Sequence, residues 1–402
     1  MISENDRLRL LRPSHRRSAN ARRSIVPPYL LERIAGADAF GLERAAAAAR
    51  RSLTADPALR AERWREGERQ GLGDAGGGRR SLTSRSGSGA LASPGSAASL
   101  IAGEAAERAV PDRTVYDAAG SETLPGRVVR REGAPATGDP AADEAYDGLG
   151  ATHALLLDAF GRDSIDGKGL PLLASVHYGR DYDNAFWDGD RMVFGDGDGE
   201  VFGRFTASLS VIGHELAHGV TQYEAGLVYQ GQAGALNESF SDVIGALVEQ
   251  HRRGQTASEA DWLIGAGLFT DAVEGRALRS MLEPGTAYDD DVLGRDPQPA
   301  DMAGYVDTAD DNGGVHLNSG IPNRAFALAA IELGGRAWET VGPVWYDTVG
   351  GPLLSPTADF AEFAEATITT AGERYGGRSR EVSAIEGAWR TVGVRSDEPA
   401  AR

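Results

Sequence analysis

The sequence predicts an α+β protein in which a region of short strands precedes a mostly helical region. Residues 113–205 carry short alternating or β-branched stretches separated by turn residues, which is typical of strands. After residue 205 the apolar spacing becomes helical and stays mostly helical to the end. A stretch rich in glycine, serine and alanine, 72–103, lies before both regions, and its composition indicates a flexible linker.

The part of the chain before this linker is predicted to hold two short ordered elements. Residues 1–24 are polar and rich in arginine and serine, so we expect them to be poorly ordered. Pro27 and Pro28 impose an extended stretch, after which Tyr29 to Ile34 offers a short apolar face. Residues 38–53 predict a helix because they carry a run of alanines.

The two later regions are assembled from short segments. The predicted strands are Thr114–Tyr116, Arg127–Val129, Ala174–Tyr178, Met192–Phe194 and Val201–Phe202. The predicted helices are 206–224, 236–251, 322–334, 358–375 and 380–391. The Gly-Asp-Gly-Asp-Gly stretch at 195–199 suggests a calcium loop, but we interpret it as a surface turn.

Composition limits the chemistry that the chain can perform. Its 402 residues suggest two or three units, and the 41% of apolar residues are enough for a sizeable core. The chain has no cysteine, which excludes disulfides and thiolate metal sites. Any bound metal must therefore be held by histidine, aspartate or glutamate side chains.

Charge divides the chain into a basic leader and an acidic body. Residues 1–113 carry 20 arginines and 13 acidic residues, whereas the rest carries 21 basic and 46 acidic residues. The two parts are thus placed to attract each other, or the acidic body simply favours solubility. A body with this much negative charge argues against nucleic-acid binding.

The sequence lacks the usual marks of membrane insertion and of export. No apolar run approaches the ~20 residues of a membrane span. Arginines at positions 16, 17, 22 and 23 are not followed by the apolar core of a classical signal peptide, so export would need another route.

A metal site is predicted within the helical run 206–224. His214 and His218 are four residues apart, which places both imidazoles on one face of a helix, about 40° apart. Glu215 lies about 60° round from His218 and can reach a water molecule at the metal without binding the metal. Taken alone, the pattern also fits two histidines in a surface or core position.

A second predicted helix supplies carboxylates at the same spacing. Glu238 and Asp242 are four apart, so one can be the third metal ligand while the other accepts the free ring N–H of a histidine. Taken alone, the two acids also fit the first turn of a helix, where the helix dipole favours negatively charged side chains. Two histidines with one glutamate leave zinc an open fourth position, as in catalytic sites.

The chemistry of such a site is hydrolysis. Zinc lowers the pKa of a bound water to about 7, and Glu215 is placed to move its proton. Tyr229 and His316 are candidate donors to the developing oxyanion, with Asp311 orienting His316. Taken alone, the segment from Asp311 to His316 also fits a glycine turn with a surface histidine.

Several long motifs, in order, resemble the thermolysin-like neutral metallopeptidases. They are Asp183-Asn184-Ala185-Phe186-Trp187, residues 192–199, His214 to Glu249, Leu278-Arg279-Ser280-Met281 and residues 311–320. The resemblance covers nearly all of 113–395. The Pro27-Pro28-Tyr29-Leu30 segment resembles the short propeptide of the protealysin branch.

The resemblance implies a fold, an activity and a set of site residues. The fold would be two-lobed, with a β-rich N-terminal lobe, a helical C-terminal lobe and the zinc-binding helix in the cleft between them. Zinc would be bound by His214, His218 and Glu238, with Glu215 as base. Oxyanion stabilisation would fall to Tyr229 and His316, with Asp311 behind His316 and Asp242 behind a zinc-bound histidine.

Substrate contacts are implied in the same way. Asn184 and Ala185 would bind the substrate backbone, and Arg279 would bind a substrate carbonyl. The pocket for the residue after the scissile bond would be lined by Phe202, Phe205, Val211, Ile264, Leu268 and Leu278. All six are apolar, which implies cleavage before bulky apolar residues such as leucine or phenylalanine, with weak discrimination among them.

The paired calcium site of the family looks degraded in this sequence. The matching positions are Ser210, Glu249, Asp261, Leu263 and Ala266, and three of these five are not acids. Calcium needs several oxygen ligands, so we predict that the double site is absent.

The sequence therefore predicts a zinc metalloendopeptidase made as a precursor, with zinc as its cofactor and proteins, peptides and its own propeptide as partners. We expect residues 1–110 to be propeptide and linker, 111–224 and 225–395 the two lobes, and 396–402 a tail. The leader would close the cleft until it is cut near residues 104–113, and we expect the enzyme itself to make this cut.

Two alternatives and the cellular location complete the prediction. A non-catalytic zinc- or peptide-binding protein would require loss of Glu215, Tyr229 or His316, and all three are present. A leader that is a separate interaction module would survive in the mature protein. We expect a secreted monomer that binds neither nucleic acid nor membrane, with a cytoplasmic location as the alternative.

Overall fold

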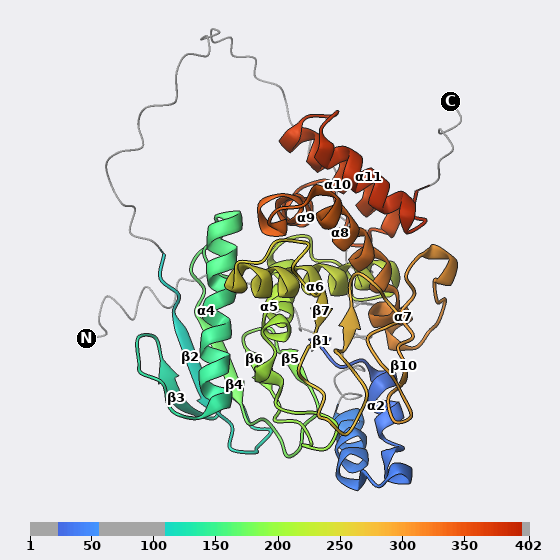
Figure 1. Cartoon of the computed structure of the whole chain (residues 1–402). Coiled ribbons are helices and arrows are strands. Elements are labelled where there is room, and N and C mark those ends of the chain that lie inside the picture. Colours follow the sequence, from blue (N-terminus) through green and yellow to red (C-terminus); the bar gives the residue numbers. More distant parts are fainter. Residues whose placement is uncertain (1–22, 56–108, 396–402) are drawn as a thin grey trace, which may run out of the picture.

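The computed structural model describes residues 23–55 and 109–395 of the chain. The predictions for residues 1–22, for the linker 72–103 and for the tail 396–402 fall outside these ranges. Arg23 and Ser24, which were expected to be poorly ordered with the rest of 1–24, form a strand instead, because they pair with a strand of the body. Figure 1 shows the described elements as a strand-rich part beside helix α4 (Pro140–Phe160), a helical part at the top and the short leader elements at the lower right. The predicted α+β architecture is confirmed.

A six-stranded sheet forms the first part. Its strand order is β1-β5-β6-β4-β2-β3. The strands are β1 (Arg23–Ser24), β2 (Arg113–Asp117), β3 (Arg127–Arg131), β4 (Leu172–Val176), β5 (Ala185–Trp187) and β6 (Met192–Phe194). Strands β2, β4 and β6 run parallel, whereas β5 is antiparallel to β6 and to β1. The edge strand next to β5 therefore comes from the leader.

Helix α4 packs against the sheet and was not predicted from the sequence. Asp139 begins it by accepting a hydrogen bond from the Ala141 N–H at 3.0 Å. Gly148 and Gly150 weaken the helical signal, but Gly148 has a packing role. A Cβ at Gly148 would lie 2.3 Å from Cδ1 of Ile212, so the glycine lets α4 approach the next helix closely.

Two long helices pass through the centre of the molecule. Helix α5 (Leu209–Tyr223) follows the 3₁₀ turn η2 (Phe205–Ala207), and together they match the predicted helix 206–224. Helix α6 (Gly231–Arg253) begins five residues before the predicted start at 236. A Cβ at Gly245 would lie 2.3 Å from the Ser210 carbonyl oxygen, so this glycine allows α5 and α6 to pack against each other.

The remaining helices form the second part of the molecule. They are α7 (Asp311–Asn318), α8 (Gly320–Leu333), α9 (Val341–Gly350), α10 (Phe360–Tyr375) and α11 (Arg380–Thr391). Helices α8, α10 and α11 match the predictions, whereas α7 and α9 were missed. Trp345 of α9 and Trp389 of α11 stack with ring centroids 6.0 Å apart and centre this core.

Short elements connect α6 to the helical part. Strand β7 (Leu263–Ile264) pairs with β8 (Arg279–Ser280), and β9 (Asp289–Asp290) pairs with β10 (Gly294–Arg295). The 3₁₀ turns η3 (Met302–Gly304) and η4 (Ala337–Glu339) precede α7 and α9.

Among the described residues, no helix combines the length and apolar character that a membrane crossing requires.

The leader folds into a small helical unit against the body (Figure 1). It contains α2 (Pro28–Ile34), the 3₁₀ turn η1 (Ala37–Phe40) and helical residues 43–55, so the predicted helix 38–53 is divided at Gly41. Gly41 adopts φ 81°, a left-handed conformation that favours glycine.

Polar contacts attach the leader to the body. Arg44 and Arg51 both pair with Asp181, at 2.5 and 3.1 Å. The Ala45 N–H donates to Glu200 at 2.9 Å, and the Asp183 N–H donates to the Ser52 hydroxyl at 3.2 Å. The basic leader therefore meets acidic groups of the body, but exposed ion pairs of this kind contribute little to stability because solvent screens them.

The turn at 195–199 differs from the predicted surface turn. Asp198 is fully buried, and one of its carboxylate oxygens accepts N–H groups of Glu200 and Val201 at 2.5 and 2.7 Å. The carboxylate turns inward because these backbone donors would otherwise be buried without partners. Only Asp196 and Gly199 of the five residues are exposed.

His177 joins this turn to the start of α4. Its Nε2 lies 2.8 Å from Oδ2 of Asp139, and its Nδ1 lies 2.8 Å from Oδ2 of Asp196. Burial lowers the pKa of His177, but the hydrogen bonds and charges of the two aspartates outweigh it and raise the pKa to about 8. The imidazolium therefore stabilises the fold below the unfolded pKa of about 6.5, and this stabilisation disappears as pH rises through 8.

Replacing His177 with glutamine is expected to destabilise the protein by about 1 kcal/mol at pH 6 and by almost nothing at pH 9. The pKa shift alone corresponds to about 2 kcal/mol, and solvent screening of this partly exposed group reduces it. Urea unfolding of both proteins at the two pH values measures the difference. Equal destabilisation at both pH values would show that the charge of His177 has no stabilising role.

Candidate active site

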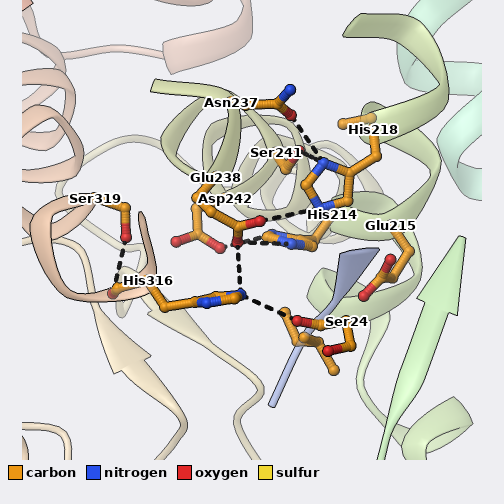
Figure 2. Close-up of polar contacts among 12 residues, drawn as sticks. Ser24, His214, Glu215, His218, Asn237, Glu238, Ser241, Asp242, His316 and Ser319 are labelled. Carbon is orange, nitrogen blue, oxygen red and sulfur yellow. Dashed lines mark hydrogen bonds and ion pairs between the residues drawn. The ribbon is translucent and has the colours of Figure 1, made fainter. Parts of the chain in front are cut away.

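The three predicted metal ligands converge between α5 and α6. His214 and His218 come from α5 and Glu238 from α6, and all three side chains are fully buried. Their candidate ligand atoms all lie within 4.8 Å of one another. Figure 2 shows both imidazoles and the carboxylate directed toward this common point.

Hydrogen bonds hold the two histidines in one orientation. Nδ1 of His214 lies 2.7 Å from Oδ1 of Asp242. Nδ1 of His218 lies 2.9 Å from the Asn237 amide oxygen and 3.0 Å from the Ser241 hydroxyl. With the proton on Nδ1, each ring turns the lone pair of Nε2 toward Glu238. Asp242 was predicted, whereas Asn237 and Ser241 were not, although Ser241 lies near Glu238 on the same helix.

The arrangement fits a divalent zinc ion. His214 Nε2 and Glu238 Oε2 lie 3.4 Å apart, and neither has a hydrogen-bond partner within the described part of the chain. Nε2 of His218 lies 3.4 Å from the other carboxylate oxygen of Glu238. Lone pairs that face one another in a buried site repel unless a cation lies between them. Two nitrogens and one carboxylate are a ligand set that zinc uses in catalytic sites.

Asp242 is also the partner of Arg279. The Nε and Nη2 groups of Arg279 donate to both carboxylate oxygens at 2.9 and 2.8 Å, and the Asn323 amide donates at 2.8 Å. Burial alone would raise the pKa of Asp242, but Arg279 and His214 hold it well below its usual range. Asp242 therefore stays ionised and fixes both a histidine and an arginine.

The predicted oxyanion donors lie beside Glu238 and contact the same two carboxylate oxygens that face the histidine ligands. Nε2 of His316 is 3.4 Å from Glu238 Oε2 and 3.4 Å from the Tyr229 hydroxyl, which itself donates to the other oxygen of Glu238. Asp311 accepts from Nδ1 of His316 at 2.7 Å and from its backbone N–H at 2.8 Å. His316 is buried, which contradicts the alternative of a surface histidine.

The backbone before His316 adopts left-handed conformations, which place the Asp311 carboxylate next to the imidazole. Asp311 and Asn312 adopt φ of 51° and 52°, and Gly313 and Gly314 adopt 83° and 71°. Four consecutive left-handed residues are rare, and the two glycines reduce their cost. Burial lowers the pKa of His316, but the negative charges of Asp311 and Glu238 raise it overall.

Glu215 points from α5 toward strand β5. It is fully buried, and its Oε2 accepts the Trp187 backbone N–H at 3.0 Å. It follows the first ligand, His214, directly in the helix, so its carboxylate lies beside the metal ligands rather than among them, as Figure 2 shows. This is the position expected of a general base.

The predicted substrate-binding residues meet a segment of the leader. Ile25 N–H donates to the Ala185 carbonyl at 3.2 Å, and Val26 N–H donates to the Asn184 amide oxygen at 3.0 Å. Arg279 Nη1 donates to the Ile25 carbonyl at 3.1 Å. The six predicted pocket residues are all buried: Phe202, Phe205, Val211, Ile264, Leu268 and Leu278.

Three of the five positions that match the family's calcium site make contacts within the protein. Ser210 is buried, and its hydroxyl accepts the Gly265 N–H at 3.1 Å. Glu249 pairs with Arg253 at 2.7 Å, and Asp261 accepts the Leu263 N–H at 3.1 Å. The absence of the double calcium site stays a prediction.

Two family models match the chain and together cover most of it. The catalytic domain of thermolysin metallopeptidases matches residues 104–222, and the α-helical domain of thermolysin metallopeptidases matches residues 225–394.

Named proteins and a solved structure agree with these matches. An extracellular metalloprotease of Pectobacterium carotovorum subsp. carotovorum is 56% identical over 283 residues, which are 70% of this chain and 81% of that protein. Protease PrtS of a Photorhabdus species is 48% identical over 288 residues, 71% of this chain and 77% of that protein. The solved precursor of protealysin, a metalloproteinase from Serratia proteamaculans, matches with a TM-score of 0.76 and 47% identity over 93% of this chain and all of that one.

Proposed function

The chain belongs to the thermolysin family of zinc metalloendopeptidases, in the protealysin-type form with a short leader, and we propose that it cleaves proteins before bulky apolar residues after freeing itself of that leader. The observation that supports this most directly is the enclosure of one point by the metal ligands, Glu215 and His316.

Each step of peptide hydrolysis has a candidate residue. His214, His218 and Glu238 would hold zinc, which would act as a Lewis acid and lower the pKa of a water molecule to near neutral pH. Glu215 accepts a proton from the attacking water and passes it to the leaving amine. His316, held by Asp311, and the Tyr229 hydroxyl donate to the carbonyl oxygen as it gains negative charge.

The substrate backbone is proposed to bind as an added strand along β5. The Ala185 carbonyl and the Asn184 side chain accept backbone N–H groups, and Arg279 donates to a carbonyl oxygen. The six apolar pocket residues support the preference for bulky apolar residues such as leucine or phenylalanine after the scissile bond. Because each methylene contributes only about 1–3 kcal/mol, we expect graded rather than absolute selectivity.

Maturation and location are proposed on the same basis. The leader, about residues 1–110, would precede the lobes 111–224 and 225–395 and would be removed near residues 104–113. We propose secretion because two relatives are named as extracellular metalloproteases, those of Pectobacterium and of Serratia marcescens. We also propose that the enzyme acts as a monomer.

The activity is tested with a quenched peptide library that varies the residue after the scissile bond. Leucine and phenylalanine are expected to exceed alanine at that position by about 10-fold or more in kcat/KM. Removing zinc with a chelator should abolish turnover, and adding zinc back should restore it. Turnover that persists in metal-free protein, or a preference for charged residues at that position, would contradict the proposal.

A further inference from the structure

The leader crosses the active site at one defined peptide bond. Ser24 of β1 pairs with Phe186 of β5 in an antiparallel register, and Ile25 continues this pairing through its N–H. The Ser24 carbonyl oxygen accepts from Nε2 of His316 at 3.1 Å, as Figure 2 shows. His316 is the group placed to donate to a carbonyl under attack, so the carbonyl that it contacts marks the position of the reacting bond.

The contacts of the two residues after Ser24 fix the register of the leader strand against β5. The Ile25 carbonyl accepts from Arg279 at 3.1 Å, and its N–H donates to Ala185 at 3.2 Å. The Val26 N–H donates to Asn184 at 3.0 Å. A shift of one residue would turn each donor and acceptor toward the wrong side of β5 and break all of these bonds together.

Burial and backbone conformation are consistent with the same register. The Ile25 and Val26 side chains are fully buried. Isoleucine is a bulky apolar residue of the kind that the proposed function places after the scissile bond. Pro27 is still extended, with φ −65° and ψ 148°, and the chain turns into α2 only at Pro28. The extended segment therefore spans the catalytic residues and ends directly beyond them.

We propose that the Ser24–Ile25 bond is a cleavage site that the enzyme hydrolyses within its own chain. This inference rests on the proposed function. Water adds its oxygen to the Ser24 carbonyl carbon, the bond between that carbon and the Ile25 nitrogen breaks, and Glu215 transfers the proton to the departing amine. The products are a carboxylate at Ser24 and a new N-terminus at Ile25.

The cut leaves the rest of the leader attached. Helical residues 43–55 remain bound through Arg44, Ala45 and Ser52, and the Ile25 carbonyl still accepts from Arg279. The segment that begins at Ile25 then occupies the cleft as a bound product. Cleavage at Ser24–Ile25 is thus a first step that precedes, and differs from, removal of the whole leader near residues 104–113.

The test follows the N-terminus of the full-length protein over time by intact mass and N-terminal sequencing, with zinc present. A chain that begins at Ile25 is expected before any chain that begins within residues 104–113. The rate constant for its formation should not change over a 100-fold range of protein concentration.

Glu215→Gln should remain uncut at this bond. Ile25→Val should retain the cut, whereas Ile25→Asp should slow it by at least 10-fold because a carboxylate would be placed in an apolar pocket.

A measurement without turnover tests the register itself. In the uncut Glu215→Gln protein, amide hydrogen exchange at Ile25 and Val26 is expected to be slow, and Ile25→Asp in the same background should accelerate it. Fast exchange in the Glu215→Gln protein would overturn the inference.

The outcomes also separate this inference from the proposed function. If the preparation hydrolyses an added peptide while Ser24–Ile25 stays intact, the inference fails and the endopeptidase assignment stands. If neither is cut, both fail. A cut at Ser24–Ile25 whose rate rises in proportion to protein concentration would also overturn the inference, because cleavage would then occur between molecules.

Discussion

Replacing Glu215 with glutamine is expected to lower kcat/KM by about 10²–10⁴-fold without loss of zinc, because the amide cannot accept the proton from the attacking water. The glutamine oxygen can still accept the Trp187 N–H, so the local structure should persist. Activity is measured with the quenched peptide, and zinc content by elemental analysis of the same sample.

The matched control for this change is Glu259→Gln, which alters the same chemical group in an exposed loop. Its activity should equal that of the unchanged protein. If Glu215→Gln retained more than a tenth of the activity, proton transfer would have to be assigned to another group. If it lost zinc as well, Glu215 would act on the metal site rather than on the water.

Replacing Arg279 with methionine is expected to lower the free energy of unfolding by about 3–5 kcal/mol. The change leaves the buried carboxylate of Asp242 without the cation that neutralises it. The remaining donors, His214 and Asn323, do not replace the two Arg279 hydrogen bonds. Urea unfolding in the Glu215→Gln background avoids self-digestion during the measurement.

The control for Arg279 is Arg336→Met, which removes an arginine from an exposed pair with Glu339. That change should cost less than about 1 kcal/mol. The direction of the Asp242 pKa also predicts that the difference between the Arg279 variant and its background shrinks as pH falls, since a protonated Asp242 no longer needs a cation. Similar losses for both arginine variants would show that burial of the pair does not matter.

The metal ligands could be predicted from sequence because their placement depends on local helix geometry. His214 and His218 share a face of α5 whatever surrounds them, and Glu238 and Asp242 share a face of α6. The partners of His218 were missed, since Asn237 and Ser241 reach its Nδ1 only through the particular packing of α5 on α6. Spacing identifies residues on one face but does not identify their contacts across a helix interface.

The elements that sequence analysis missed depend on contacts between distant residues. Helix α4 contains glycines that weaken its helical signal, and packing of Gly148 against Ile212 gives one of them a role. The pairing of β1 with β5 joins residues about 160 positions apart, for which no local pattern exists. Asp198 was expected at the surface because aspartate and glycine usually form exposed turns, but its bonds to buried N–H groups draw it inward.

The strand that the leader adds to β5 has a consequence for the proteins that the enzyme can digest. Any chain that replaces it must present about three consecutive residues in the extended conformation, with their backbone N–H and carbonyl groups free to bond to Asn184, Ala185 and Arg279. A helix or the interior of a sheet has already used those groups. Susceptibility of a folded target should therefore follow the free energy of its local unfolding, so that loops and frayed ends are cut first and stable cores survive.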